Sequence, residues 1–188
     1  MDNDIFQLLY ESKQAHALVG MFTDSSDYST FELGWIIDIS EDFYILMSLD
    51  EHGDFASNQL GRNVDVHQIS LASNYISNFE RLHKNMPGIE ANTPNQRADI
   101  HALLQHLQKA GEILTLDTYR GQAITGFAIE ILDTAIIMDE LTVQGLYNAT
   151  IALPLTEVRG ITWSGKSEKS IRRLRDYASE FELEQTED

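Results

Sequence analysis

The chain has 188 residues, 43% of them hydrophobic, and its 30 acidic and 13 basic side chains give a formal net charge of −17. Such a charge argues against a nonspecific binder of nucleic acid or anionic lipid, because an acidic surface repels phosphate groups. The absence of cysteine excludes disulfides, thiolate zinc sites, iron–sulfur clusters and cysteine nucleophiles. The sequence shows no basic segment leading into an apolar core and no apolar run of membrane-spanning length, so we expect a cytoplasmic protein with no membrane partner.

The first half of the chain predicts a short helix, five strands and a second helix. Apolar residues at helical spacing mark the two helices, near residues 5–14 and 76–82. Between them, runs rich in β-branched, aromatic and aliphatic residues alternate with turn-forming clusters of Ser, Asp, Glu and Gly. We expect strands at residues 16–23, 31–38, 43–49, 54–58 and 64–71.

Residues 85–97 hold two prolines, a glycine and three asparagines, a composition that neither a helix nor a central strand tolerates well. This segment predicts a boundary between a first unit at residues 1–90 and a second at residues 91–188. The second unit is expected to open with a helix near residues 100–107 and to close with one near residues 171–181, followed by an acidic tail. Its strands are expected at residues 112–118, 123–132, 135–142, 146–152 and 157–163.

The two halves match each other at a nearly fixed spacing. Gly34 and Gly126 lie 92 positions apart, as do Gly53 and Gly145 (126−34 and 145−53), and the apolar residues around them also correspond. Upstream, the apolar residues of the two opening helices correspond at a separation of 95. Because the apolar pattern recurs while the polar residues differ, the repeat says more about how the chain folds than about what it binds.

Each copy carries a glycine in its second strand, followed by alternating apolar residues, an acidic turn and an apolar third strand. These residues are Gly34, Ile36, Asp42, Phe43, Ile45 and Leu46 in the first copy and Gly126, Ala128, Asp133, Ile136 and Met138 in the second. A second motif, an apolar residue followed by Arg-Gly, occurs at residues 158–160, and residues 67–70 are a loose counterpart of it in the first copy. In these motifs each half resembles the Sm-like fold of the Sm and LSm proteins and their bacterial RNA-chaperone relatives. The resemblance implies a mainly β protein of two tandem small five-stranded open barrels, each with a leading and a trailing α-helix.

RNA-binding members of that family place an asparagine three residues after the turn aspartate, where its amide reads a base edge. In the first copy Tyr44 or Ile45 takes that position, depending on the register, and in the second copy Ile136 takes it. An isoleucine cannot read a base edge, whereas Tyr44 could either stack on a base or pack within its strand. The other candidates for RNA contacts are Arg159 and Gly160 and the last-helix residues Lys169, Arg172, Arg173 and Arg175, unless these cations form only the solvated side of a helix.

Residues 160–167 match the phosphate-loop pattern, in which two glycines five positions apart are followed by Lys and Ser. In this interpretation Gly160, Gly165, Lys166 and Ser167 bind phosphate. The alternative is a chance match at a strand–helix turn, because bulky side chains lie inside the pattern and only 21 residues follow Ser167 (188−167). These are too few for the crossover and the parallel strand that normally carry the magnesium-binding aspartate.

No other grouping of polar residues indicates catalysis. The acidic run from Asp50 to Asp54 is typical of a hairpin turn, with a metal site as the alternative, and His101 and His106 do not share a helix face. We therefore expect no catalytic residue, no resident metal and no cofactor. The leading hypothesis is a noncatalytic interaction module that self-assembles through strand edges or docks on a protein with a basic face. The alternatives are a regulator that binds short single-stranded RNA and a nucleotide-binding protein.

Overall fold

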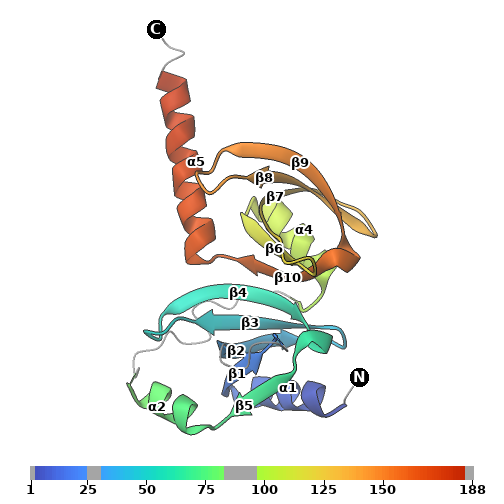
Figure 1. Cartoon of the computed structure of the whole chain (residues 1–188), viewed down its shortest axis with the longest axis vertical. Helices are drawn as coiled ribbons and strands as arrows, with labels where there is room; N and C mark the ends of the chain where they lie inside the picture. Colours follow the sequence, from blue (N-terminus) through green and yellow to red (C-terminus); the bar gives the residue numbers. More distant parts are fainter. Residues whose placement is uncertain (1–2, 25–30, 83–96, 185–188) are drawn as a thin grey trace. The chain divides into compact units, whose positions relative to one another are not determined.

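The computed structural model describes residues 3–24, 31–82 and 97–184 (Figure 1). The protein is mainly β, with helices flanking its strands, and it divides into two compact units, Met1–Leu103 and Leu104–Asp188. The linker expected at residues 85–97 lies outside the described residues except for Arg97, and so do the last four residues of the expected acidic tail. None of the described helices is long and apolar enough to cross a membrane.

In the first unit, five antiparallel strands lie in the order β5-β1-β2-β3-β4, so that the last strand along the chain pairs with the first. One helix precedes the strands and another follows them. The elements are α1 (Asn3–Ala15), β1 (Leu18–Phe22), β2 (Glu32–Ile39), β3 (Phe43–Leu49), β4 (Phe55–Arg62), a 3-10 helix (Asn63–Asp65), β5 (Gln68–Leu71) and α2 (Asn74–Leu82).

The two helices of the first unit cover opposite faces of its sheet. Leu9 of α1 belongs to a buried cluster that includes Ile36 of β2. Phe79 of α2 belongs to a second buried cluster, which includes Trp35, the neighbour of Ile36 on the same strand. Because successive side chains of a strand point to opposite faces, the two clusters lie on opposite sides of the sheet.

The second unit has the same strand arrangement, in the order β10-β6-β7-β8-β9. Its closing helix α5 packs on the sheet through Ile171, which is buried with Ile113 and Leu141, and its C-terminal part extends past the strands (Figure 1). The elements of the second half are α4 (Ile100–Ala110), β6 (Leu114–Thr118), β7 (Ala123–Ile131), β8 (Ala135–Leu141), β9 (Tyr147–Pro154), a 3-10 helix (Leu155–Glu157), β10 (Val158–Trp163) and α5 (Lys166–Glu184).

The spacing of the repeat in the sequence is also the spacing of the elements. β3 and β8 are 92 positions apart at both ends (135−43 and 141−49), and α2 and α5 begin 92 positions apart (166−74). Gly53 and Gly145 occupy equivalent hairpin turns with φ of 79° and 80°, a left-handed conformation that favours glycine. The same chain path therefore occurs twice, down to the backbone of one turn.

The repeated glycines of β2 and β7 lie directly against the backbone of the next strand. A Cβ at Gly34 would come within 2.2 Å of the carbonyl oxygen of Met47, and one at Gly126 would come within 2.0 Å of that of Asp139. In both strands the register shifts shortly after the glycine. Glycine therefore permits a close strand approach beside a bulge that bends the sheet, as the sequence predicts.

The strand expected at residues 64–71 is shorter in the structure, where β5 begins only at Gln68. The chain instead forms a 3-10 helix beginning at Asn63, whose side-chain amide donates hydrogen bonds of 2.9 Å to the carbonyl oxygens of Ser40 and Glu41. These bonds tie the chain to the turn between β2 and β3 and interrupt the extended conformation. β4 is longer than expected and continues to Arg62, because it pairs with β3 along that strand's whole length.

Candidate interaction sites

Two of the basic residues predicted to contact RNA pack α5 onto its own sheet. The guanidinium carbons of Arg172 and Arg175 lie 5.3 and 4.9 Å from the ring centre of Phe127 on β7. Arg172 also donates a hydrogen bond to the carbonyl oxygen of Gly111 and lies 3.9 Å from the carboxylate of Glu112. Each cation–π contact contributes about 0.5–1 kcal/mol at a partly exposed site. The two arginines therefore stabilise the docking of the helix.

Lys169 and Arg173 are exposed on α5 and line a hollow of about 270 Å³. Glu112 and Glu168 line the same hollow and offset much of its positive charge. Glu168 is only 5% exposed, and its carboxylate accepts a hydrogen bond of 2.6 Å from the hydroxyl of Thr115. The structure thus brings the predicted cations together, but in the company of two carboxylates.

Arg159 lies in β10 at a shift of its register with β6, close enough to Asp117 to act on its charge. The pKa of Asp117 is raised above its ordinary value because burial disfavours the charged carboxylate and the negative Glu168 adds to this effect, while Arg159 opposes it. Arg159 therefore contributes to the electrostatic surroundings of Asp117 within the second unit.

The residues of the phosphate-loop pattern are not arranged as a loop. Gly160 lies within β10, which stays paired with β6 as far as Trp163. Two residues, the second of them Gly165, separate this strand from α5, where Lys166 and Ser167 are exposed in the first turn. In a phosphate-binding loop the backbone amides between the two glycines turn toward the ligand, whereas here those of residues 161–163 belong to a strand pair. We do not propose nucleotide binding.

Tyr44 is 4% exposed and belongs to the buried cluster beneath α1. Its ring lies over Gly61 of β4, where a Cβ would come within 2.2 Å of the phenolic oxygen. Packing within the strand pair accounts for this tyrosine, and its ring face is occupied by protein atoms.

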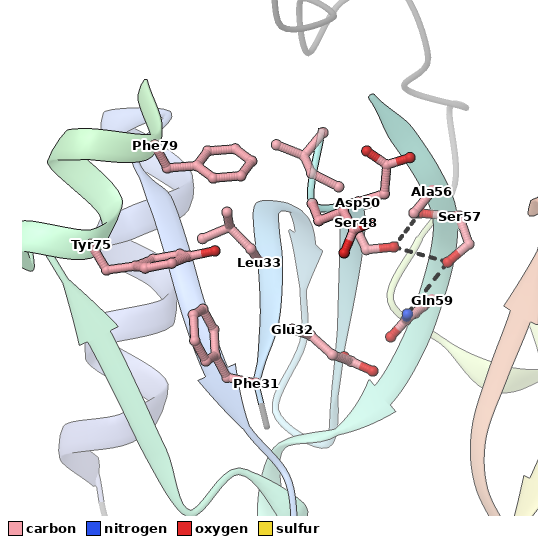
Figure 2. Close-up of a pocket in the computed structure, with 12 residues that line it drawn as sticks. Phe31, Glu32, Leu33, Ser48, Asp50, Ala56, Ser57, Gln59, Tyr75 and Phe79 are labelled. Carbon is pink, nitrogen blue, oxygen red and sulfur yellow. Dashed lines mark hydrogen bonds between the residues drawn. The ribbon is translucent and has the colours of Figure 1, made fainter. Parts of the chain in front are cut away.

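The first unit contains an open groove between α2 and the strands β2, β3 and β4 (Figure 2). Its volume is about 420 Å³. This lies within the range of about 300–1,000 Å³ that is usual for ligand sites. Figure 2 shows aromatic side chains on the α2 side and polar side chains on the β4 side.

The aromatic wall of the groove consists of Phe31, Tyr75 and Phe79. The rings of Phe31 and Tyr75 meet edge to face, with centres 5.2 Å apart and an interplanar angle of 86°, and the ring of Phe79 stacks on Tyr75 at 6.1 Å. Phe79 is buried in the core, whereas Tyr75 remains 53% exposed although its ring is fixed by both neighbours. The wall therefore presents an ordered aromatic surface to solvent.

The polar wall is a connected hydrogen-bond network across β2, β3 and β4. The hydroxyls of Ser48 and Ser57 lie 2.9 Å apart, and Gln59 lies 3.3 Å from Ser57 Oγ. In the amide orientation that satisfies all its neighbours, the Gln59 oxygen faces the Ser57 hydroxyl and accepts from it, while the Gln59 nitrogen donates to the carboxylate of Glu32 at distances of 3.0 and 2.7 Å. The network therefore fixes the position of the Glu32 carboxylate.

Every charged side chain that lines the groove is acidic. Besides Glu32 these are Asp50 and Glu51, and no lysine or arginine is among the described residues of the lining. Asp50 accepts hydrogen bonds of 2.9 and 3.0 Å from the backbone N–H groups of His52 and Asp54, so this acidic run forms the hairpin turn that its composition predicts. Within the described part of the chain no cluster of potential ligands suits a metal ion.

This groove has no clear signal in the amino-acid sequence. Tyr75 stands between the apolar positions that mark α2, whereas Phe31 and Glu32 lie where β2 starts, so their meeting depends on the return of α2 over the sheet. The signal that was available is the pair Tyr75 and Phe79, four positions apart on one helical face. Comparisons with known proteins add nothing to it, since no model of a protein family matches the chain and no curated protein matches it significantly.

Proposed function

We propose that the protein is a noncatalytic interaction module of two Sm-like units that docks on a protein with a basic face. The observation that carries the proposal is the groove of the first unit, where three carboxylates face an aromatic wall without a lysine or arginine in the described lining. Residues 1–94 hold 15 acidic and 4 basic side chains, a net charge of −11 (4−15). Long-range attraction would steer a basic partner toward such a surface, and the aromatic wall would supply contact area.

Support for the Sm-like assignment comes from three repeated features. In each half the strand that comes last pairs with the one that comes first, a helix precedes the strands, and a glycine in the second strand permits a close approach. The proposed role as a contact platform follows from this assignment, because small bent sheets with exposed edges associate with other chains.

Binding of a cationic peptide to the full chain tests the proposal. The probe is a short blocked peptide in which lysine alternates with glycine, titrated calorimetrically at about 50 mM and about 300 mM salt. The proposal predicts saturable binding with a stoichiometry near one that weakens as salt rises. Absence of binding at low salt, or adsorption without saturation, would contradict it.

Self-association is the other form of this function, and the ends of the strand orders favour it. Among the described residues, β5 pairs only with β1 and β9 pairs only with β8, so each strand has one edge available for a further strand. Light scattering over a range of protein concentrations separates the two forms. A mass that rises with concentration supports assembly, and a constant mass of one chain leaves docking on a different protein.

Binding of short single-stranded RNA is a second candidate, supported by the exposure of Lys169 and Arg173 beside one hollow. This candidate predicts affinity for an oligonucleotide at low salt. Arg173→Ala should lower that affinity, since each lost phosphate contact weakens binding and reduces its salt dependence. Fluorescence anisotropy with a labelled oligouridine measures this. An affinity that Arg173→Ala leaves unchanged would remove the candidate.

A further inference from the structure

We propose that the groove of the first unit binds a lysine or arginine side chain carried by an extended segment of the partner protein. The methylene stem would lie along Phe31 and Tyr75, and the charged head would reach the carboxylate of Glu32. This inference rests on the proposed function and adds to it the atoms that recognise the partner.

The aromatic wall suits the stem and the charge of such a side chain. Phe31 and Tyr75 meet at nearly a right angle, so the edge of one ring and the face of the other border the same space. Figure 2 shows Tyr75 reaching from α2 into the groove with its hydroxyl at the tip. A cation over such a face is attracted by the ring quadrupole, while its methylene groups cover the apolar edge.

The polar wall suits the charged head because its carboxylate is already held in place. Gln59 fixes Glu32 from the β4 side, and the Ser48–Ser57 pair anchors Gln59 in turn. A donor that arrives at Glu32 therefore forms a charge-assisted hydrogen bond without first ordering a flexible side chain. Asp50 and Glu51 at the rim add negative potential around the same space.

A cationic side chain of a protein segment suits this groove better than an apolar ligand or an anion does. An uncharged apolar ligand would remove water from the Glu32 carboxylate without supplying a donor in its place. An anion would meet three carboxylates. Because the groove is only partly enclosed, a side chain can enter it from a backbone that remains outside.

The test compares two groove variants of the full chain with matched variants outside the groove. Glu32→Gln removes the charge but keeps the shape, and Glu41→Gln removes one exposed charge from the turn between β2 and β3 as its control. Tyr75→Leu removes the aromatic face but keeps an apolar residue on α2, and Tyr177→Leu is the control on α5. Circular dichroism verifies that each variant is folded before the alternating lysine–glycine peptide is titrated.

At low salt, Glu32→Gln should weaken binding about three- to tenfold and Tyr75→Leu about two- to fivefold, whereas the controls should change it less than twofold, within about 0.4 kcal/mol. Acetylation of the peptide lysines should abolish binding.

If the native protein binds the peptide and the groove variants behave like their controls, the groove is not the site, although the proposed function stands. If free spermine competes as well as the peptide at equal charge, the ligand is a polyamine and the inference is overturned. If the native protein does not bind at all, the proposed function fails as well.

Discussion

Replacing the repeated glycines by alanine should destabilise each unit strongly, because an added methyl group has no space in either copy. The Cβ of alanine at position 34 would lie 2.2 Å from the carbonyl oxygen of Met47, and at position 126 it would lie 2.0 Å from that of Asp139. Ordinary contacts of a Cβ begin near 3.4 Å, so the neighbouring strand must retreat by 1.2 Å in the first unit (3.4−2.2) and by 1.4 Å in the second (3.4−2.0).

The cost follows from what such a retreat does to the sheet. Moving a strand by this distance lengthens the two nearest ladder hydrogen bonds beyond bonding range, at about 1 kcal/mol each. Overpacking of the surrounding core adds about 1–3 kcal/mol. The sum, about 3–5 kcal/mol, is a large part of the roughly 5–10 kcal/mol expected for a unit of this size.

Urea denaturation followed by circular dichroism measures the loss for Gly34→Ala and Gly126→Ala. Gly121→Ala is the control, because its Cβ would meet open space and its φ of 74° costs about 1–2 kcal/mol for a residue other than glycine. Both repeat variants should lose clearly more stability than the control, about 3–5 against about 1–2 kcal/mol. A loss no larger than that of Gly121→Ala at either position would refute the close strand approach in that unit.

Three further predictions concern single interactions. Lys13→Met removes the 2.6 Å ion pair with Asp38 and should cost about 1 kcal/mol at pH 7. Burial raises the pKa of Asp38, but the hydrogen bond from Lys13, backbone hydrogen bonds and the lysine charge outweigh it and lower the pKa overall. The difference in urea midpoints between the two proteins should therefore begin to shrink as the pH falls below about 4 and vanish once Asp38 is protonated in the folded protein, and a constant difference would contradict the pair. Asn63→Ala removes two hydrogen bonds to backbone carbonyls and should lower the free energy of unfolding by about 2 kcal/mol, measured by thermal denaturation. An unchanged midpoint would show that these hydrogen bonds do not hold the turn. Phe127→Leu removes both cation–π contacts and should lower the hydrogen-exchange protection of α5 by about 1–2 kcal/mol, and equal protection would place the docking energy elsewhere.

The order of the elements could be predicted because local signals and the repeat agree. Apolar periodicity locates the helices and strands, and glycines at the same spacing identify equivalent turns and close approaches. The start of β5 could not be predicted, because it depends on the side-chain amide of Asn63 reaching backbone carbonyls more than twenty positions earlier. Such a contact leaves no local pattern in the sequence.

The candidate site was harder to predict than the fold for a related reason. A run of basic residues indicates a binding surface. In the structure, however, Arg172 and Arg175 of α5 lie over Phe127 of β7, which is far upstream in the sequence. The groove joins Phe31, Tyr75 and Glu32 from segments whose proximity follows only from the folded topology. Charge along the sequence points to the basic residues of the second half, whereas the groove and the three carboxylates that line it lie in the first unit.

The most direct test of the interaction function is a map of amide chemical shifts in the full ¹⁵N-labelled chain as the lysine–glycine peptide is added. The account predicts shifts concentrated at the start of β2, at the hairpin between β3 and β4 and in α2, with saturation at one peptide per chain. Shifts centred on Lys169 and Arg173, or spread evenly over the acidic surface, would contradict it.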